Sequence, residues 1–184
     1  MQYVVLGLLA IFVCVLGYLF YRAALLLYWG MRANRLCLQG KFNESIRACD
    51  RGLRAFPGHP GLLFGRGIAL RKLGRDDEAM GSYREAICHN PKHYRACYNL
   101  GAILRDRDRF IEAAREFEEA VRIRPDYVKA HCNLAIIYEK LGRREDALLH
   151  YAQYFLSGGD DPIVRDRARQ LGLADNLLPP SRSK

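Results

Sequence analysis

The side chains with the greatest capacity for chemistry are histidines and cysteines in the second half of the chain. His93 and Cys97 are one helical turn apart, and His131 directly precedes Cys132. Imidazole and thiolate groups bind soft metals such as Zn²⁺ when several of them converge. However, the six cysteines include no Cys-x-x-Cys pair and show no regular spacing. We therefore expect no metal site, no disulfide framework and no cofactor.

Known catalytic signatures are absent from the sequence. It contains no Gly-rich phosphate-binding loop, no Gly-x-Ser-x-Gly nucleophile motif and no His-Glu-x-x-His zinc motif. Nothing in the residue order brings together an acid, a base and a nucleophile. We therefore expect that the chain is not an enzyme and takes no small-molecule substrate.

Two asparagines, Asn99 and Asn133, are separated by 34 residues. An asparagine amide donates and accepts hydrogen bonds at once, so two such groups on one surface could hold the backbone of an extended peptide. Alternatively, asparagine at this position simply suits a solvent-exposed surface. The interval is informative in itself, because the apolar pattern of the chain has the same period.

A pattern of Ala-x3-Tyr/Phe-x2-Ala-x4-Pro occurs twice at this 34-residue interval. Its members are Ala79, Tyr83, Ala86 and Pro91, and then Ala113, Phe117, Ala120 and Pro125. Apolar residues recur every three to four positions, which indicates amphipathic helices, and each proline ends a helix. We predict the helix pairs 60–73 with 76–89, and 94–107 with 110–123. Stacking such pairs buries their apolar faces and produces an α-solenoid with a concave groove.

This pattern resembles that of tetratricopeptide repeats (TPRs), which have the same period. The resemblance covers residues 26–161, which divide into the repeats 26–59, 60–93, 94–127 and 128–161. It implies an all-α fold with about four helix pairs. TPR domains generally act as receptors for proteins or peptides.

The first and last repeats depart most from the family pattern. Repeat 1 has Ser45, Cys49 and Gly52 where an alanine, an aromatic residue and an alanine are usual. Repeat 4 has Tyr154 and Gly159 where an alanine and a proline are usual. Terminal repeats of such arrays are expected to be atypical.

Residues 3–21 contain no charged side chain. As a helix this segment would be about 28 Å long, which matches the hydrocarbon core of a bilayer. A cleaved signal peptide is disfavoured, because no basic residue precedes the segment and no clean Ala-x-Ala site follows it. We predict that residues 1–25 are a transmembrane anchor whose core, 3–21, contacts the lipid bilayer. Residues 22–29 are also compatible with a helix, so we expect one long helix, in which the anchor continues into the first helix of repeat 1 or joins it through a slight kink.

The charges that flank the anchor predict its orientation. Arg22, Arg32, Arg35 and Lys41 follow the apolar segment, whereas only the α-amino group precedes it. Positive charge is retained on the cytoplasmic side, and free cysteines persist in that reducing compartment. We therefore expect a single-pass protein of a bacterial inner membrane with a cytoplasmic TPR domain. A receptor on the mitochondrial surface would have the same topology.

The C-terminal region predicts a lid for the last repeat. Asp161 followed by Pro162 is a typical helix start, and Gly172 is a typical stop. We predict a capping helix within residues 162–173, with its helical turns at about 162–171. Residues 174–184 are predicted to be a disordered tail.

The resemblance also implies where a ligand would bind, because TPR ligands usually contact fixed positions on the first helix of each repeat. Among the polar residues at these positions, which also include Lys72 and the acidic Glu139, we expect ligand contacts from Asn34, Arg71, Arg95, Tyr98, Asn99, Arg105, Lys129, Asn133 and Lys140. They predict a basic, amide-rich groove for a protein or peptide with acidic segments. The family's carboxylate clamp is incomplete, because Phe64 and Ile68 occupy positions where lysine and asparagine are required.

We therefore expect a membrane-anchored TPR adaptor that recruits a partner or assists assembly of a membrane or envelope complex. The chief alternative is a structural subunit that a larger membrane complex holds mainly through the transmembrane helix. A nucleic-acid-binding helical repeat is a minor alternative raised by the net charge of +9. It is disfavoured because basic and acidic residues alternate along the helices, and we expect no nucleic-acid partner.

Overall fold

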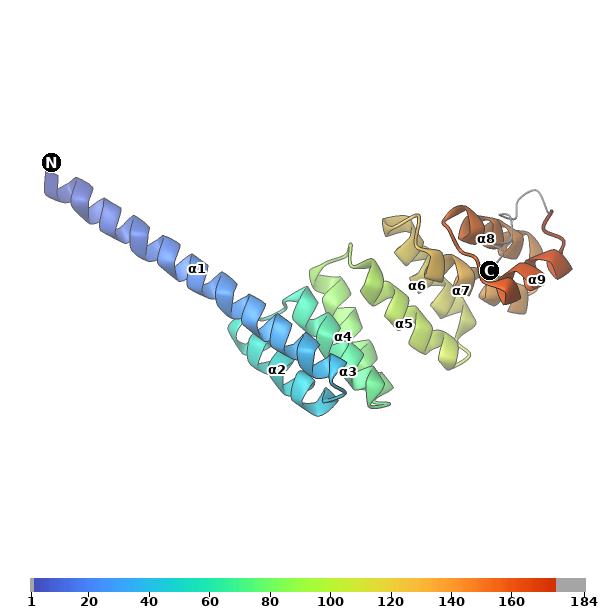
Figure 1. Ribbon diagram of the computed structural model, residues 1–184, viewed down its shortest axis with the longest axis horizontal. Coiled ribbons are helices and arrows are strands. Elements are labelled where there is room, and N and C mark those ends of the chain that lie inside the picture. The colour runs from blue at the N-terminus through green and yellow to red at the C-terminus, as the bar shows by residue number, and fades with distance from the viewer. Residues whose placement is uncertain (1, 175–184) are drawn as a thin grey trace. The chain divides into compact units, whose positions relative to one another are not determined.

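The computed structural model describes residues 2–174, and for residues 2–10 it describes the backbone only. Across this range the chain forms nine helices and no strand, so the predicted all-α fold is confirmed. The chain divides into two compact units, residues 1–85 and 86–184. Each unit is described separately below (Figure 1).

The first unit begins with a single uninterrupted helix, α1 (Gln2–Leu38), as the sequence predicted. It is followed by α2 (Phe42–Ala55), α3 (Pro60–Lys72) and most of α4 (Asp76–His89). The C-terminal part of α1 packs against α2 and α3, and its N-terminal part projects beyond them (Figure 1).

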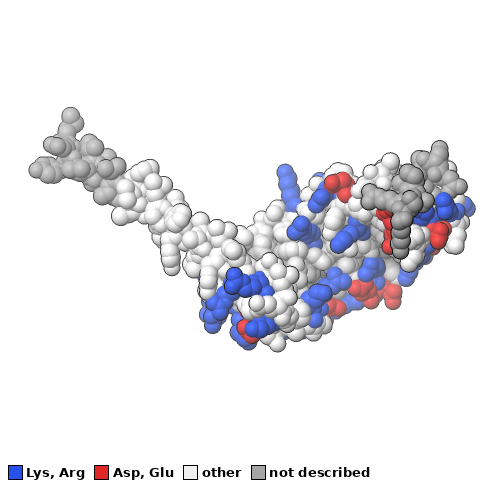
Figure 2. All heavy atoms as spheres, in the orientation of Figure 1, with Lys and Arg blue, Asp and Glu red and all other residues white. Residues whose placement is uncertain are grey.

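The projecting part of α1 has the length and composition of a membrane-spanning helix. The described segment that meets these criteria is Ile11–Leu38, and its most apolar stretch is not buried by the rest of the chain. Figure 2 shows no charged atom on the described half of this projection, whereas basic side chains appear where α1 reaches α2. The prediction of a single apolar helix is thus confirmed, and its insertion into a membrane stays a prediction.

The unusual residues of repeat 1 have identifiable packing roles. The buried Ser45 hydroxyl donates a hydrogen bond to the Ala33 carbonyl at 2.8 Å, so a serine is accommodated between α1 and α2. At Gly52, an added Cβ would lie 2.8 Å from a methyl carbon of Leu62 and 3.0 Å from the Trp29 Cβ. Glycine therefore suits this position, where α1, α2 and α3 approach one another closely.

Helices α3 and α4 also approach each other closely, at Gly67. An added Cβ there would lie 2.5 Å from a ring carbon of Tyr83, which is fully buried. Nearby, Arg66 takes a position where leucine is usual in the family. Its guanidinium forms an ion pair with Asp50 and donates a hydrogen bond to the Ser82 hydroxyl, which ties α3 to α2 and α4.

The second unit contains two helix pairs and a terminal helix. The pairs are α5 (Tyr94–Asp106) with α6 (Phe110–Ile123), and α7 (Val128–Lys140) with α8 (Arg144–Leu156). The helix expected at 162–171 is α9 (Pro162–Leu171). The Asp161 carboxylate accepts a hydrogen bond from the Ile163 amide at its start, and Gly172 has a φ of +100° at its end.

Helix α9 covers the apolar side of α8. Val164 and Ala168 are buried in one cluster with Tyr154 and Phe155, which is the lid function expected for this segment. Tyr154 also explains why repeat 4 has Gly159 where a proline is usual. At Gly159 an added Cβ would lie 2.3 Å from the Tyr154 ring, so the two departures occur together. The tail predicted for 174–184 lies outside the described residues, apart from its first residue.

Candidate functional site

The clearest candidate site is a pocket of about 610 Å³ in the first unit, bounded by α1, α2 and α3. Its wall is mainly apolar. The apolar lining includes Gly30, Ala33, Leu38, Leu62, Phe64 and Ile68. Two exposed polar residues, Asn34 from α1 and Lys72 from α3, also line it. We refer to this space as the α1–α3 pocket.

The pocket exists because repeat 1 lacks a pair of aromatic side chains that repeats 2 and 3 possess. In repeat 2 the ring centroids of Phe64 and Tyr83 lie 5.9 Å apart. In repeat 3 the corresponding rings, 34 residues further on, lie 5.4 Å apart. The equivalent positions in repeat 1 are Gly30 and Cys49, and both line the pocket. Replacing two rings by a hydrogen atom and a thiol leaves volume that no other side chain fills.

The chemistry of the α1–α3 pocket suits binding rather than reaction. Cys49 is its most obvious nucleophile, but burial raises the pKa of its thiol to about 12. The thiol is therefore protonated at neutral pH and unreactive. What remains is a mainly apolar cavity whose wall also carries the Asn34 amide, the Lys72 ammonium, the Ser45 hydroxyl and the Cys37 thiol. Such a cavity could hold an apolar side chain and orient the polar groups beside it.

Of the site residues predicted in the first two repeats, Asn34 lines the pocket and Arg71 does not. Sequence reasoning missed the apolar lining at Phe64 and Ile68. In the sequence, the apolar character of these two positions indicated only that the carboxylate clamp is incomplete. The sequence did contain a signal for this lining, because Phe64 and Ile68 are apolar residues at ligand-facing positions, opposite the small residues of repeat 1.

In the second unit the structure brings together four of the predicted site residues, three through their side chains and Lys129 through its backbone carbonyl. Asn133 is buried, and its Oδ1 accepts a hydrogen bond from the Arg105 guanidinium. Its Nδ2 donates to the Tyr98 hydroxyl at 3.3 Å and to the Lys129 carbonyl at 2.8 Å. Both protons of the Asn133 amide are therefore used within the chain. A peptide that accepts a hydrogen bond from this group would have to displace an existing partner.

The remaining predicted residues make local contacts. Asn99 Nδ2 donates to the Arg95 carbonyl at 2.9 Å, which repeats the Asn133–Lys129 geometry one repeat earlier. The Lys140 ammonium lies 4.7 Å from the centre of the Phe110 ring. Bonds of this type, from an asparagine to the carbonyl four residues back, favour the reading in which asparagine serves the helix surface. Binding of a peptide by these residues stays a prediction.

The histidine and cysteine residues that could have suggested a metal have structural partners. His93 caps α5, because its Nδ1 accepts a hydrogen bond from the Ala96 amide at 3.3 Å. Cys97 is fully buried, and burial raises the pKa of its thiol to about 12. His131 is also buried, in contact with His150. Each of these side chains contributes to a cap or to the core.

Helix pairs that recur every 34 residues, with a pocket facing the first helices of two repeats, define a protein-interaction scaffold built from helical repeats. Two family models match the chain, one described as "TPR repeat" over residues 101–142 and one as "Tetratricopeptide repeat" over residues 31–92. The chain is a tetratricopeptide-repeat protein. Proteins of this family are typically non-catalytic scaffolds.

Solved structures of MamA proteins have a similar fold. A structure titled "MamA 41-end from Desulfovibrio magneticus RS-1" has a TM-score of 0.71 and 19% sequence identity, and the match covers 83% of this chain and 86% of that one. Another, titled "Crystal structure of MamA protein", has the same TM-score and identity, and covers 84% and 87%. At this identity the similarity concerns the fold alone. None of the curated proteins compared with the chain matches it significantly.

Proposed function

We propose that this protein is a single-pass membrane adaptor that holds a segment of a partner protein in the α1–α3 pocket. The observation that carries the proposal is the pocket itself. It combines a volume of about 610 Å³ with an apolar wall, and it opens at positions where TPR domains usually contact their ligands. The fold supports the class of function, and the pocket supports the site.

The pocket chemistry favours a particular kind of partner segment. An apolar side chain of the partner would fill the space left by Gly30 and Cys49. The Asn34 amide can both donate and accept, which suits one peptide group of an extended chain. Lys72 is basic, and residues 22–85 contain twelve basic but only six acidic residues. This positive charge favours an acidic residue in the partner segment, next to its apolar side chain.

The anchor would give this pocket a fixed position relative to a membrane. Residues 3–21 and the pocket-lining residues of α1 belong to one unbroken helix. Gly30 is nine residues beyond Tyr21, which is roughly 13 Å along a helix axis. A partner bound there would be held close to the cytoplasmic membrane surface. We accordingly propose recruitment or assembly of a membrane complex, without catalysis and without nucleic acid.

A second function is favoured by the surface of α1 beyond the proposed span. Leu27, Met31 and Leu38 are 64%, 67% and 82% exposed, although they lie within or next to the repeat domain. A large complex could cover these side chains together with the anchor. The protein would then be a structural subunit held mainly through α1.

A substitution at Gly30 tests the pocket directly. An added Cβ at Gly30 meets nothing within 4 Å, and phenylalanine is the residue that repeat 2 has at the equivalent position. Gly30→Phe should therefore fill the pocket without disturbing the fold. Losing burial of one apolar partner side chain costs about 1.5–3 kcal/mol, so we expect partner recovery from native membranes to fall by at least about tenfold. Quantitative mass spectrometry of affinity-purified full-length protein measures this.

Gly30→Ala is the matched control, because it changes helix propensity but adds little volume. It should recover the partner as the natural protein does. If Gly30→Phe recovers the same partners in the same amounts, the pocket is not the binding site. Partner loss after replacing residues 3–21 with an unrelated anchor sequence would then favour the structural subunit.

A further inference from the structure

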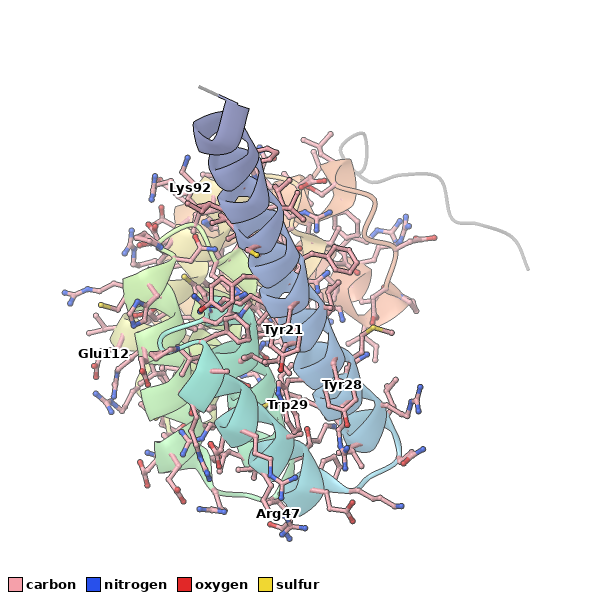
Figure 3. The ribbon with its side chains drawn as sticks, turned by 90° about the vertical axis from the view of Figure 1, so that its left-hand side faces the viewer. Tyr21, Tyr28, Trp29, Arg47, Lys92 and Glu112 are labelled. Carbon is pink, nitrogen blue, oxygen red and sulfur yellow. The ribbon has the colours of Figure 1, made fainter. Side chains whose placement is uncertain are left out.

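A second, smaller cleft lies on the other side of the α1–α2 contact. It has a volume of about 170 Å³, and its lining includes Trp29 and Arg32 from α1 and Glu44, Arg47 and Arg51 from α2. Figure 3 shows Trp29 on the side of α1 that faces α2, with Arg47 extending from α2, and the Tyr28 ring is in edge contact with the Trp29 ring, 5.0 Å between their centres. We refer to this space as the arginine cleft.

The arginines of this cleft are arranged around one aromatic ring. The guanidinium carbons of Arg32 and Arg51 lie 5.9 and 6.0 Å from the centre of the Trp29 ring. Arg47 is one turn before Arg51 on α2. The side chains of all three arginines are exposed, so their N–H groups are accessible to a ligand. Arg32 donates one hydrogen bond to the Tyr28 hydroxyl. The other N–H groups of its guanidinium can still donate to a ligand.

The basic side chains of α2 are compensated by fewer acidic residues than those of α4, α6 and α8, which are the second helices of the other repeats. Helices α4, α6 and α8 each contain more acidic than basic residues, whereas α2 has three arginines and two acids. One of those acids, Asp50, is paired with Arg66. Among the described residues, neither Arg47 nor Arg51 has a carboxylate within ion-pair distance. Three guanidinium groups thus converge with only the Glu44 carboxylate among them, a combination that favours an anion.

The cleft also lies next to the end of the proposed membrane span. Arg22, which follows the uncharged segment, donates a hydrogen bond to the Ala55 carbonyl at 3.3 Å, and its guanidinium carbon lies 5.0 Å from the centre of the Phe56 ring. These contacts hold the C-terminal end of α2 beside the end of the anchor. Trp29 is roughly 10 Å further along α1, and Arg51 roughly 6 Å from Ala55 along α2. These distances are comparable with the depth of the lipid headgroup region and the Debye length.

We propose that the arginine cleft binds the phosphate of an anionic phospholipid headgroup. The proposal rests on the membrane-anchoring part of the proposed function and is independent of the α1–α3 pocket. Arg47 and Arg51 supply bidentate donors to the phosphate oxygens, and Trp29 lies at the depth where aromatic side chains favour the interface. Lipid binding at this point would fix the tilt of α1 and therefore the direction in which the α1–α3 pocket faces.

The sequence provides a direct reporter, because Trp29 is the only tryptophan. Full-length protein in a neutral detergent is titrated with short-chain phosphatidylglycerol while Trp29 emission is followed. Parallel titrations use short-chain phosphatidylcholine and inorganic phosphate. We expect a saturable change with phosphatidylglycerol at a concentration at least about tenfold lower than with either of the others. Each basic residue near an anionic surface contributes enough that Arg47→Gln or Arg51→Gln should weaken binding by about fivefold.

Arg84→Gln is the matched control, because Arg84 is an exposed arginine on α4, outside the cleft. It should bind as the natural protein does. Equal responses to both lipids, or unchanged binding by the Arg47 and Arg51 variants, would overturn the proposal. An equal response to inorganic phosphate would indicate a soluble phosphate ligand instead. Thermal melts of each variant exclude unfolding, and carbonate extraction of native membranes tests anchoring separately from these titrations.

Discussion

At the scale of single residues, the turn between the two helices of each repeat shows how the 34-residue period determines backbone conformation. Gly40, Gly74 and Gly142 have φ between +72° and +73°, in the left-handed region that glycine favours. The third repeat has Asp108 at the same position, with a φ of +57°. The fold therefore requires this conformation in every repeat, including the one that lacks glycine.

The same substitution at two glycines should change stability in opposite directions. Gly142 has a left-handed φ, and an added Cβ there would meet nothing within 4 Å, so Gly142→Ala introduces backbone strain only and should destabilise the fold by about 1 kcal/mol. Gly81 lies in an exposed part of α4, where an added Cβ also meets nothing. Gly81→Ala should stabilise by about 0.5–1 kcal/mol. Urea unfolding measures both, and a loss of stability at Gly81 would contradict this account.

At the scale of helices, the repeat pattern was sufficient to predict where elements begin and end. The expected helices 76–89 and 110–123 are present as Asp76–His89 and Phe110–Ile123. Gly74 and Pro91 flank the first of these helices, and Asp108 and Pro125 flank the second. The pocket was not predicted, because it depends on missing volume. Cys49 looked like a weak match to the family, and only the packing around it shows that space remains.

The groove residues illustrate a second limit of sequence reasoning. Asn133 was predicted from its type and register, and the structure places it beside Tyr98 and Arg105. The spacing could not show that its amide would bond to these side chains, since that depends on how α5 and α7 pack. Polar residues at ligand-facing positions can serve the fold itself, so register alone does not establish a ligand contact.

The contact between α7 and α8 contains a histidine pair, in which His131 is buried and His150 is partly buried. His131 Nε2 lies 2.7 Å from the Pro125 carbonyl, which can only accept, so this nitrogen carries the proton. His131 Nδ1 then accepts from His150 Nδ1 at 3.1 Å. His150 also stacks on Tyr138, whose hydroxyl donates to Glu118 of α6. Burial, and secondarily electrostatic interaction with the neighbouring His131, lower the pKa of His150 to about 4, although Glu118 and Asp146 oppose this.

Stability should therefore decrease in mild acid. The unfolded His150 has a pKa near 6.5, so between about pH 6.5 and pH 4 the unfolded state binds a proton that the folded state does not. The stabilisation is complete above this range and is lost as the pH falls through it. Urea unfolding at several pH values measures the slope. His150→Phe should reduce it, whereas His89→Gln, at an exposed site, should not; equal slopes in all three proteins would refute this assignment.

At the scale of the whole molecule, the account requires that residues 3–21 anchor the chain with its repeats in the cytoplasm. The full-length protein should resist carbonate extraction, and protease should digest the repeats in inverted membrane vesicles but not in right-side-out ones. Val13→Arg with Leu16→Arg is the control. An arginine at the centre of a span costs about 2.5–3.5 kcal/mol, so this variant should appear in the soluble fraction. Extraction of the natural protein by carbonate would contradict the anchoring.

If the α1–α3 pocket holds a partner segment, a photocrosslinker at position 34 should capture that partner. A benzoylphenylalanine replaces Asn34, which lines the pocket and is exposed, in the full-length protein within native membranes. The account predicts one dominant adduct that persists with Gly30→Ala and disappears with Gly30→Phe. An adduct that persists at full yield when Gly30→Phe fills the pocket, or no adduct in any of the three proteins, would contradict it.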